Sequence, residues 1–152
     1  MKKKLYLANP YGFSKQTKKL LNEFIKIFND LKIEVYEPFE RTKNMAKKEG
    51  AWAYKIAKSN LNDLQKCDCI FAVVNGVPPD EGVMIELGIA IALKKEIFLF
   101  RDDFRICADS NEYPLNLMLF LGLPKENWKK NFFESLQDIK SNKKGFMEWA
   151  NK

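Results

Sequence analysis

The stretch "DCIFAVVNG", Asp68–Gly76, decides the fold because it has the pattern of a strand that is apolar on both faces. Every residue from Cys69 to Val74 is apolar, and the turn dipeptide Asn75-Gly76 follows them. Strands that are buried on both faces are typical of a parallel sheet covered by helices on two sides. We therefore expect Asp68–Gly76 to be a central strand of such a sheet.

Similar apolar segments surround this strand, and they alternate between strand and helix patterns. The short runs Lys4–Pro10, Lys32–Pro38 and Glu96–Asp103 predict three more strands. Apolar residues at helical spacing predict helices over four ranges, with a last short helix in 143–152: Ser14–Leu31, Ala51–Lys66, Asp80–Leu93 and Asn127–Ile139. Phe39–Gly50 is expected to be a polar loop, and Tyr113–Pro124 a short apolar element.

This alternation of strands and helices indicates the class of fold. Successive parallel strands are joined by right-handed crossovers, and the helices then cover both faces of the sheet. We predict an α/β fold, a flavodoxin-like doubly wound parallel sheet. The chain has 152 residues, which is the length of one compact domain, and neither a linker nor a repeat interrupts it. We therefore assign residues 1–152 to a single domain.

The charge of the chain excludes some classes of partner. The formal net charge is +6, but only Arg41, Arg101 and Arg105 are arginines, and the lysines are scattered over several segments. Readers of phosphates and bases favour arginine gathered on one face, so we expect no nucleic-acid partner. No apolar run is long enough to span a bilayer, and the N-terminal segment does not resemble a signal peptide. We expect a cytoplasmic protein with no membrane partner.

Histidine and cysteine are informative because they are scarce. The chain has no histidine, which excludes Ser-His-Asp and Cys-His catalysis and every histidine-ligated metal. Its three cysteines include Cys67 and Cys69 in a C-x-C arrangement without a second pair, so we expect neither a disulfide framework nor a zinc site. We predict no metal and no cofactor. Acid–base chemistry would then come from carboxylates, Tyr, Lys or Cys.

One carboxylate stands out in the segment that follows the central strand. Glu86 lies within "NGVPPDEGVMIELGIAIAL", Asn75–Leu93, a helix pattern that is apolar all round and is therefore expected to be buried. A buried carboxylate costs several kcal/mol unless it is paired. Glu86 is either a structural charge, paired with a lysine or placed at a subunit surface, or a desolvated nucleophile or base that faces a ligand.

The predicted fold places a second carboxylate near the first. Ligands of doubly wound sheets bind beyond the carboxyl ends of the strands, where the turns after Asn9 and Asn75 lie. Asp80 begins the next helix at this edge, where a carboxylate also caps a helix and favours its dipole. Asp80 and Glu86 are six positions apart and can share one pocket. Paired carboxylates without histidine suggest glycosyl transfer at a sugar carbon.

Four segments together resemble the nucleoside 2-deoxyribosyltransferase family. They are "KLYLANP" (Lys4–Pro10), "SNLNDLQKCDCIFAVV" (Ser59–Val74), "DEGVMIELG" (Asp80–Gly88) and "NLM" (Asn116–Met118). They occur in the order found in the family and run from Lys4 to Met118. The spacing D-x5-E alone is a weak signal, whereas the four segments together are fairly specific.

The resemblance implies a role for each matching residue in an exchange of bases between 2′-deoxynucleosides and free nucleobases. Glu86 would attack C1′ and form a covalent 2-deoxyribosyl-enzyme, with overall retention of configuration. Asp80 would contact the base and shuttle its proton, and Tyr6 would position Glu86. Asn60 aligns where some family members place an aspartate that contacts the base, and an amide can also make such a contact.

The resemblance also implies a homo-oligomer in nucleoside salvage. Asn116 and Met118 would come from a neighbouring subunit, where they would hold the sugar 5′-hydroxyl and close the pocket. No metal or organic cofactor would be needed.

Three alternatives compete with this interpretation. The first is a 2′-deoxynucleoside 5′-monophosphate N-hydrolase, which typically has a serine at the position of Asn116. The second is a non-catalytic nucleotide-binding module that uses the same crevice without turnover. The third is a flavin-binding protein, which we rank lower because no Ser/Thr-rich phosphate loop follows the first predicted strand.

Overall fold

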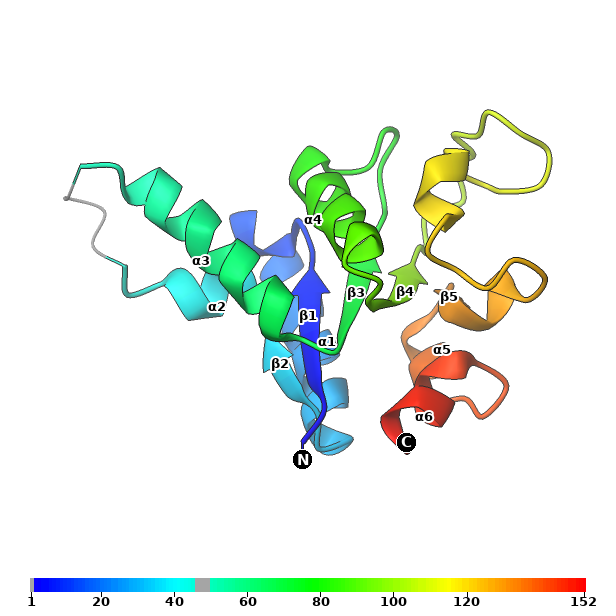
Figure 1. The fold of residues 1–152 in the computed structure, drawn as a ribbon, viewed down its shortest axis with the longest axis horizontal. Coiled ribbons are helices and arrows are strands. Elements are labelled where there is room, and N and C mark those ends of the chain that lie inside the picture. The colour runs from blue at the N-terminus through cyan, green and yellow to red at the C-terminus, as the bar shows by residue number, and fades with distance from the viewer. Residues whose placement is uncertain (1, 46–49) are drawn as a thin grey trace.

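The computed structural model describes residues 2–45 and 50–152, which form a sheet with helices on both faces (Figure 1). Within this part of the chain, five strands lie in the order β2-β1-β3-β4-β5 and every neighbouring pair is parallel. The strands are β1 Lys4–Ala8, β2 Glu34–Tyr36, β3 Cys69–Val73, β4 Glu96–Phe100 and β5 Phe132–Phe133. The predicted α/β flavodoxin-like fold is confirmed, and β3 is the central strand.

The helices divide between the two faces of this sheet. The helix α1 (Thr17–Asp30) packs on one face with the short helices α5 (Leu136–Ile139) and α6 (Gly145–Ala150). The opposite face carries α3 (Trp52–Lys66) and α4 (Glu81–Ala92). Both ends of the chain lie at the edge where the strands begin (Figure 1). The edge where the strands end is thus free of termini.

Strand alternation produces two separate cores. On the α1 face, aromatic rings from the sheet and the helices interlock, among them Phe24, Phe71, Phe98 and Phe146. On the α3/α4 face, Tyr6 and the aliphatic side chains of α4 pack over the sheet. Successive residues of a strand point to opposite faces, so Tyr6 lies on the α4 face while its neighbours Leu5 and Leu7 lie on the α1 face.

Two predictions of secondary structure were wrong. Asn127–Ile139 is not one helix, since it contains the 3-10 helix η3 (Trp128–Asn131), β5 and α5. Phe132 and Phe133 are both buried and pair with β4, and a capping box at Ser135 begins the next helix. Their apolar spacing fits a helix as well as a buried edge strand.

The second error concerns the loop expected over Phe39–Gly50. The structure begins a short helix, α2 (Pro38–Thr42), where Glu37 caps the chain by accepting from the Glu40 amide. Proline suits the first position of a helix, because its missing N–H would have no helical partner there. Residues 46–49 of the expected loop lie outside the described residues.

The sequence predicts that the helix carrying Glu86 is buried on every side. In the structure it is buried on one side only. Val83, Leu87 and Ala90 are buried, whereas Ile85 is 64% exposed and Leu93 is 43% exposed. Neighbouring α4 is the 3-10 helix η2 (Leu117–Phe120), near which Leu117, Met118 and Leu121 are also exposed. Much of the apolar area of these side chains is therefore open to solvent in the single chain.

No helix in the described part of the chain is both long enough and apolar enough to cross a membrane.

Candidate active site

A cavity of about 700 Å³ lies beyond the ends of β1 and β2, between α2, α3 and the start of α4. Three of the residues singled out from the sequence line it: Asn60, Asp80 and Glu86. They come from the middle of one helix and the first turns of another, so the fold itself brings them together. The position agrees with the rule that doubly wound sheets bind ligands at the carboxyl ends of their strands.

Glu86 is tied to the sheet beneath it. The hydroxyl of Tyr6 donates a hydrogen bond of 2.6 Å to Glu86 Oε1. Glu86 forms no ion pair with any lysine or arginine that the structure describes, which argues against a structural salt bridge. Burial, with smaller contributions from the charges of Asp80 and Glu37, raises the pKa of Glu86 to about 7, and the hydrogen bond from Tyr6 partly opposes this rise.

Tyr6 remains a proton donor in this pair. It is 1% exposed, and burial together with the charge of Glu86 holds its pKa far above the usual value. The phenol therefore keeps its proton at any pH near neutrality, and its hydrogen bond directs one carboxylate oxygen of Glu86. The arrangement resembles that of an oriented nucleophile or base.

Asp80 both caps α4 and lines the cavity, as the sequence allows. Its Oδ1 accepts a hydrogen bond of 3.0 Å from the Val83 amide, and this bond caps α4. The same side chain lines the cavity that Glu86 lines. A carboxylate at this end of a helix is stabilised by the helix dipole.

Asn60 lines the cavity and has one unused acceptor atom. Its Oδ1 atom is buried and has no hydrogen-bond partner among the described residues. Leaving such an atom unpaired costs about 1–3 kcal/mol, and a ligand that donates a hydrogen bond would remove this cost. Asn60 is therefore suited to recognise a donor group.

Asn116 and Met118 do not line this cavity. Asn116 caps η2 by accepting from the Met118 amide at 3.0 Å, and its Nδ2 donates to Asp109 at 2.8 Å. Met118 is 57% exposed. A single chain thus does not bring these two residues to Glu86, and their arrival from a neighbouring subunit stays a prediction.

Asn9 and Phe13 also line the cavity, and neither was assigned a site role from the sequence. Asn9 donates to Glu37 at 3.0 Å, and the Tyr11 amide donates to Asn9 at 2.9 Å, so the segment after β1 is bound to the end of β2. Phe13 is 80% exposed at the cavity and packs edge-to-face on Phe39 at 4.7 Å. Only the position of Asn9 after a predicted strand could have indicated its role.

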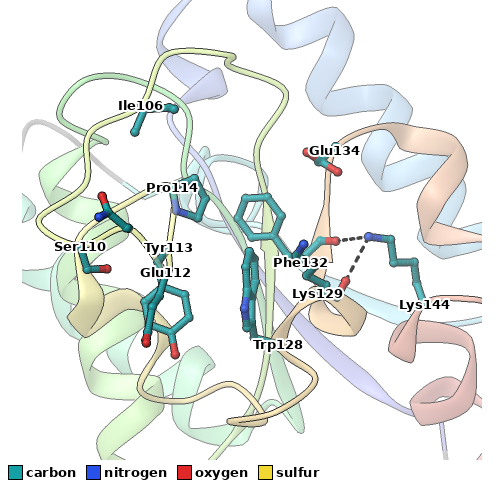
Figure 2. A pocket seen from close by; sticks show the side chains of 11 residues that line it. Ile106, Ser110, Glu112, Tyr113, Pro114, Trp128, Lys129, Phe132, Glu134 and Lys144 are labelled. Carbon is teal, nitrogen blue, oxygen red and sulfur yellow. Dashed lines mark hydrogen bonds between the residues drawn. The ribbon is translucent and has the colours of Figure 1, made fainter.

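A second cavity, of about 510 Å³, lies near β5 and holds none of Tyr6, Asp80 and Glu86 (Figure 2). Trp128 and Phe132 form an aromatic wall there, and Lys144 Nζ donates to the carbonyls of Lys129 and Phe132. Lys129, Glu112 and Glu134 also line it, but no ion pair among the described residues joins a lysine to a carboxylate there. We therefore place the candidate active site in the cavity of Glu86.

The described residues hold no cluster of three or more His, Cys, Asp or Glu side chains suited to a metal ion. The polar side chains that line the cavity are two carboxylates and two amides, together with the hydroxyl of Thr42 and the ammonium group of Lys43. Such groups can donate and accept hydrogen bonds, and the carboxylates can exchange protons.

Three solved structures share the fold with this chain. A 2-deoxyribosyltransferase from Bacillus psychrosaccharolyticus is 24% identical, with a TM-score of 0.70, and the match covers 91% of this chain and 90% of that one. A 2-desoxiribosyltransferase from Leishmania mexicana is 25% identical, with a TM-score of 0.70 and coverage of 98% and 97%. A conserved protein from Enterococcus faecalis V583 is 22% identical, with a TM-score of 0.72 and coverage of 91% and 95%.

No curated protein sequence matches the chain. The family model for nucleoside 2-deoxyribosyltransferase matches residues 5–118, which is most of the chain and includes Tyr6, Asn60, Asp80 and Glu86. Because this match covers most of the chain, the chain belongs to the nucleoside 2-deoxyribosyltransferase family.

Proposed function

We propose that this protein exchanges the base of 2′-deoxynucleosides through a covalent 2-deoxyribosyl-glutamate intermediate, as an enzyme of cytoplasmic nucleoside salvage. The observation that carries the proposal is the hydrogen bond from Tyr6 to Glu86 at the cavity that Asp80 also lines. Membership of the family and the likeness to the Leishmania mexicana enzyme support it.

The first half of the reaction forms the intermediate. The ionised carboxylate of Glu86 attacks C1′ of the sugar, and the bond between C1′ and the base nitrogen breaks. The electron pair of that bond goes to the base, which takes a proton from Asp80 as it leaves. A carboxylate close to C1′ also stabilises the oxocarbenium-like transition state of such a reaction.

The second half reverses these events with a different base. A nitrogen of the incoming base attacks C1′, its proton passes to Asp80, and the carboxylate of Glu86 is released. Each half inverts C1′, so the product retains the original configuration. A cavity with apolar and aromatic walls favours a base over water as the acceptor.

Recognition of the base falls to Asn60 in this proposal. Its unpaired Oδ1 accepts from an amino or ring N–H group of the base, which satisfies the buried oxygen. Phe13 lies at the same cavity and offers an aromatic face to the planar ring. No metal or organic cofactor enters this scheme.

The sugar would be held by a neighbouring subunit of a homo-oligomer. Asn116 and Met118 lie on the exposed apolar surface formed near η2, next to α4. Exposed apolar side chains of this kind mark interaction sites. Asn116 keeps one amide hydrogen free after its bond to Asp109, and it directs that hydrogen to the 5′-hydroxyl of a substrate in the adjoining subunit.

The competing hydrolase of 2′-deoxynucleoside 5′-monophosphates is less well supported. The carboxylate of Asp109 lies 2.8 Å from Asn116 Nδ2, beside the group expected to meet the 5′ position. A negative charge there repels a phosphate and tolerates a hydroxyl. The binding-module alternative differs in that it requires no carboxylate nucleophile.

The test is an exchange assay with 2′-deoxyinosine or thymidine as donor and adenine as acceptor, in which wild type and Glu86→Ala are compared by chromatography. We expect 2′-deoxyadenosine from the wild type and none from Glu86→Ala. Free base released from a 2′-deoxynucleoside monophosphate without transfer would establish the hydrolase instead. Ligand binding without turnover of any of these compounds would establish a binding module.

A further inference from the structure

The turn between β3 and α4, residues 74–80, delivers Asp80 to the candidate active site. Gly76 has a φ of 107°, a conformation that residues with a Cβ rarely adopt, and it bridges to Pro79 across the turn. No helix or strand contains these residues, so contacts from outside the turn must hold it. The position of Asp80, at the end of the turn, depends on those contacts.

Arg101 supplies the first set of contacts. It follows β4 directly, is 4% exposed, and donates through Nη1 to the carbonyls of Val74 and Gly76. Its Nη2 donates to the carbonyl of Arg105 in the next loop. One buried guanidinium thus joins two positions of the turn to the loop after β4.

Asn75 supplies the second set from within the turn. Its Oδ1 accepts from the amides of Asp102 and Asp103 at 3.1 and 3.3 Å, and its Nδ2 donates to the Tyr11 hydroxyl at 2.9 Å. The Gly76 amide also donates to Asp103 Oδ2 at 3.1 Å. Three loops at this edge of the sheet are therefore joined through the turn.

The cost of this arrangement argues that it has a purpose beyond stability. A buried cation is expensive to desolvate, and Arg101 also keeps a buried Nε without a hydrogen-bond partner in the described residues. Its nearest carboxylate, Asp103, is 3.9 Å away and is bound mainly to Arg105. An apolar residue would fill the same space at lower cost but could not bind the carbonyls of Val74 and Gly76 in the turn.

We infer that Arg101 is a positioning residue that, together with Asn75, holds the turn 74–80 so that Asp80 can protonate the departing base. The inference rests on the proposed function for the role of Asp80. Arg101 touches neither the substrate nor Glu86 in this account. Its effect on the reaction therefore passes through Asp80 alone.

The test compares two donors that differ in their need for an acid. Hypoxanthine leaves 2′-deoxyinosine as it gains a proton, whereas the cationic base of 7-methyl-2′-deoxyguanosine leaves as a neutral molecule without one. Single-turnover release of base, with enzyme in excess, isolates the first half-reaction. We expect Arg101→Met to slow release from 2′-deoxyinosine by about 100-fold, the usual scale of general acid catalysis, and from the methylated donor by less than about threefold.

A double-mutant comparison shows whether Arg101 acts through Asp80. Asp80→Asn should show the same dependence of base release on the donor. Adding Arg101→Met to Asp80→Asn should slow the release of base from 2′-deoxyinosine no further. Arg101→Lys should recover part of the rate, because its ammonium group can still donate to a carbonyl. The inference would be overturned if Arg101→Met slowed base release equally from both donors. It would also be overturned if the rate losses of the two single variants multiplied in the double variant.

Amide exchange tests the same inference without turnover. In Arg101→Met, the peptide that contains Gly76–Val83 should exchange faster than in wild type. The control is Ile139→Ala, a core truncation in α5 that destabilises the fold generally and should leave both donor rates and this peptide unchanged at a temperature where it is folded. Unchanged exchange in Arg101→Met would overturn the inference. Unchanged turnover in Glu86→Ala would instead refute the proposed function, while the exchange result would still decide whether Arg101 holds the turn.

Discussion

Tyr6 and Glu86 are joined by a hydrogen bond of 2.6 Å although they are 80 positions apart in the chain. Tyr6 is the third residue of β1 and faces α4, and Glu86 lies within the first two turns of that helix. The bond opposes the effect of burial on the carboxylate, whose pKa is nevertheless raised to about 7. Glu86 is thus close to half ionised at neutral pH, and small changes around it alter its charge.

Replacing Tyr6 by phenylalanine should move the pH dependence of turnover. The Tyr6 hydroxyl stabilises the ionised form of Glu86, so its removal raises the pKa of that carboxylate above about 7. Because the nucleophile must be ionised, the acidic limb of kcat/KM should shift to higher pH. At pH 7 we also expect kcat/KM to fall roughly tenfold, because Glu86 is less well oriented without the hydroxyl. This is the scale of one charge-assisted hydrogen bond. A pH–rate profile measures both effects, and a limb that stays in place would contradict the assigned hydrogen bond.

Replacing Glu86 by glutamine should stabilise the protein while it abolishes transfer. In the folded protein the pKa of Glu86 lies above its ordinary value of 4.5, so the folded state prefers the protonated form. The contribution of Glu86 to the free energy of unfolding is therefore fully present below pH 4.5 and is lost as the pH rises through about 7. A pKa shift of this size corresponds to roughly 3 kcal/mol in the free energy of unfolding above pH 7.

Urea unfolding of wild type and Glu86→Gln at two pH values measures this effect. The variant should be more stable than wild type at pH 8 and equal to it near pH 4, since glutamine never ionises. Gln137→Glu, an exchange of the same two residue types in the reverse sense within α5, serves as a control away from the cavity. Equal stability of wild type and Glu86→Gln at pH 8 would mean that Glu86 is not desolvated.

Replacing Asn60 by leucine should weaken binding of the base without weakening the fold. The buried Oδ1 has no partner within the described chain, so its removal costs the free protein little and can stabilise it by about 1 kcal/mol. The KM for the acceptor base should rise by roughly 3- to 10-fold, the value of one hydrogen bond. Thermal unfolding and acceptor kinetics measure the two effects. A fall in Tm with an unchanged KM would show that Asn60 serves the fold instead.

Two inactive variants should restore activity to each other if subunits share their sites. Glu86→Ala lacks the nucleophile, and Asn116→Ala lacks the amide expected from a neighbouring subunit. Mixed oligomers, formed by co-expression, contain some sites with both groups intact. With equal amounts of the two chains mixed at random, they should recover about a quarter of the wild-type rate. Mixtures that remain as inactive as their components would place both groups in the same subunit or remove Asn116 from the site.

Local patterns predicted much of this structure. The apolar run of β3 and the helical spacing of α1, α3 and α4 are properties of neighbouring residues, and each element occurs where its pattern lies. The failures occurred where the same pattern suits two structures. Phe132 and Phe133 fit a helix until β4 is seen to offer them a strand partner.

The candidate site was predictable in its residue types and less so in its contacts. Asp80 and Glu86 were expected together because both lie at the start of one helix. Arg101 was not singled out, since nothing adjacent to it in the chain indicates that it binds the turn after β3. Its partners come from a different strand end, and only the parallel pairing of β3 with β4 brings them within reach.

The sequence by itself determined the order of the first four strands and of α1, α3 and α4, the exclusion of histidine chemistry, and the presence of a carboxylate in an apolar helix. These features are local, because hydrophobic period and residue type need no knowledge of distant contacts. The tertiary structure decided that Glu86 is bound by Tyr6, that Asn60 keeps an unpaired oxygen, and that Arg101 holds the turn before Asp80. Each of these depends on packing between segments far apart in the chain, where burial sets both the pKa of a carboxylate and the cost of an unpaired atom.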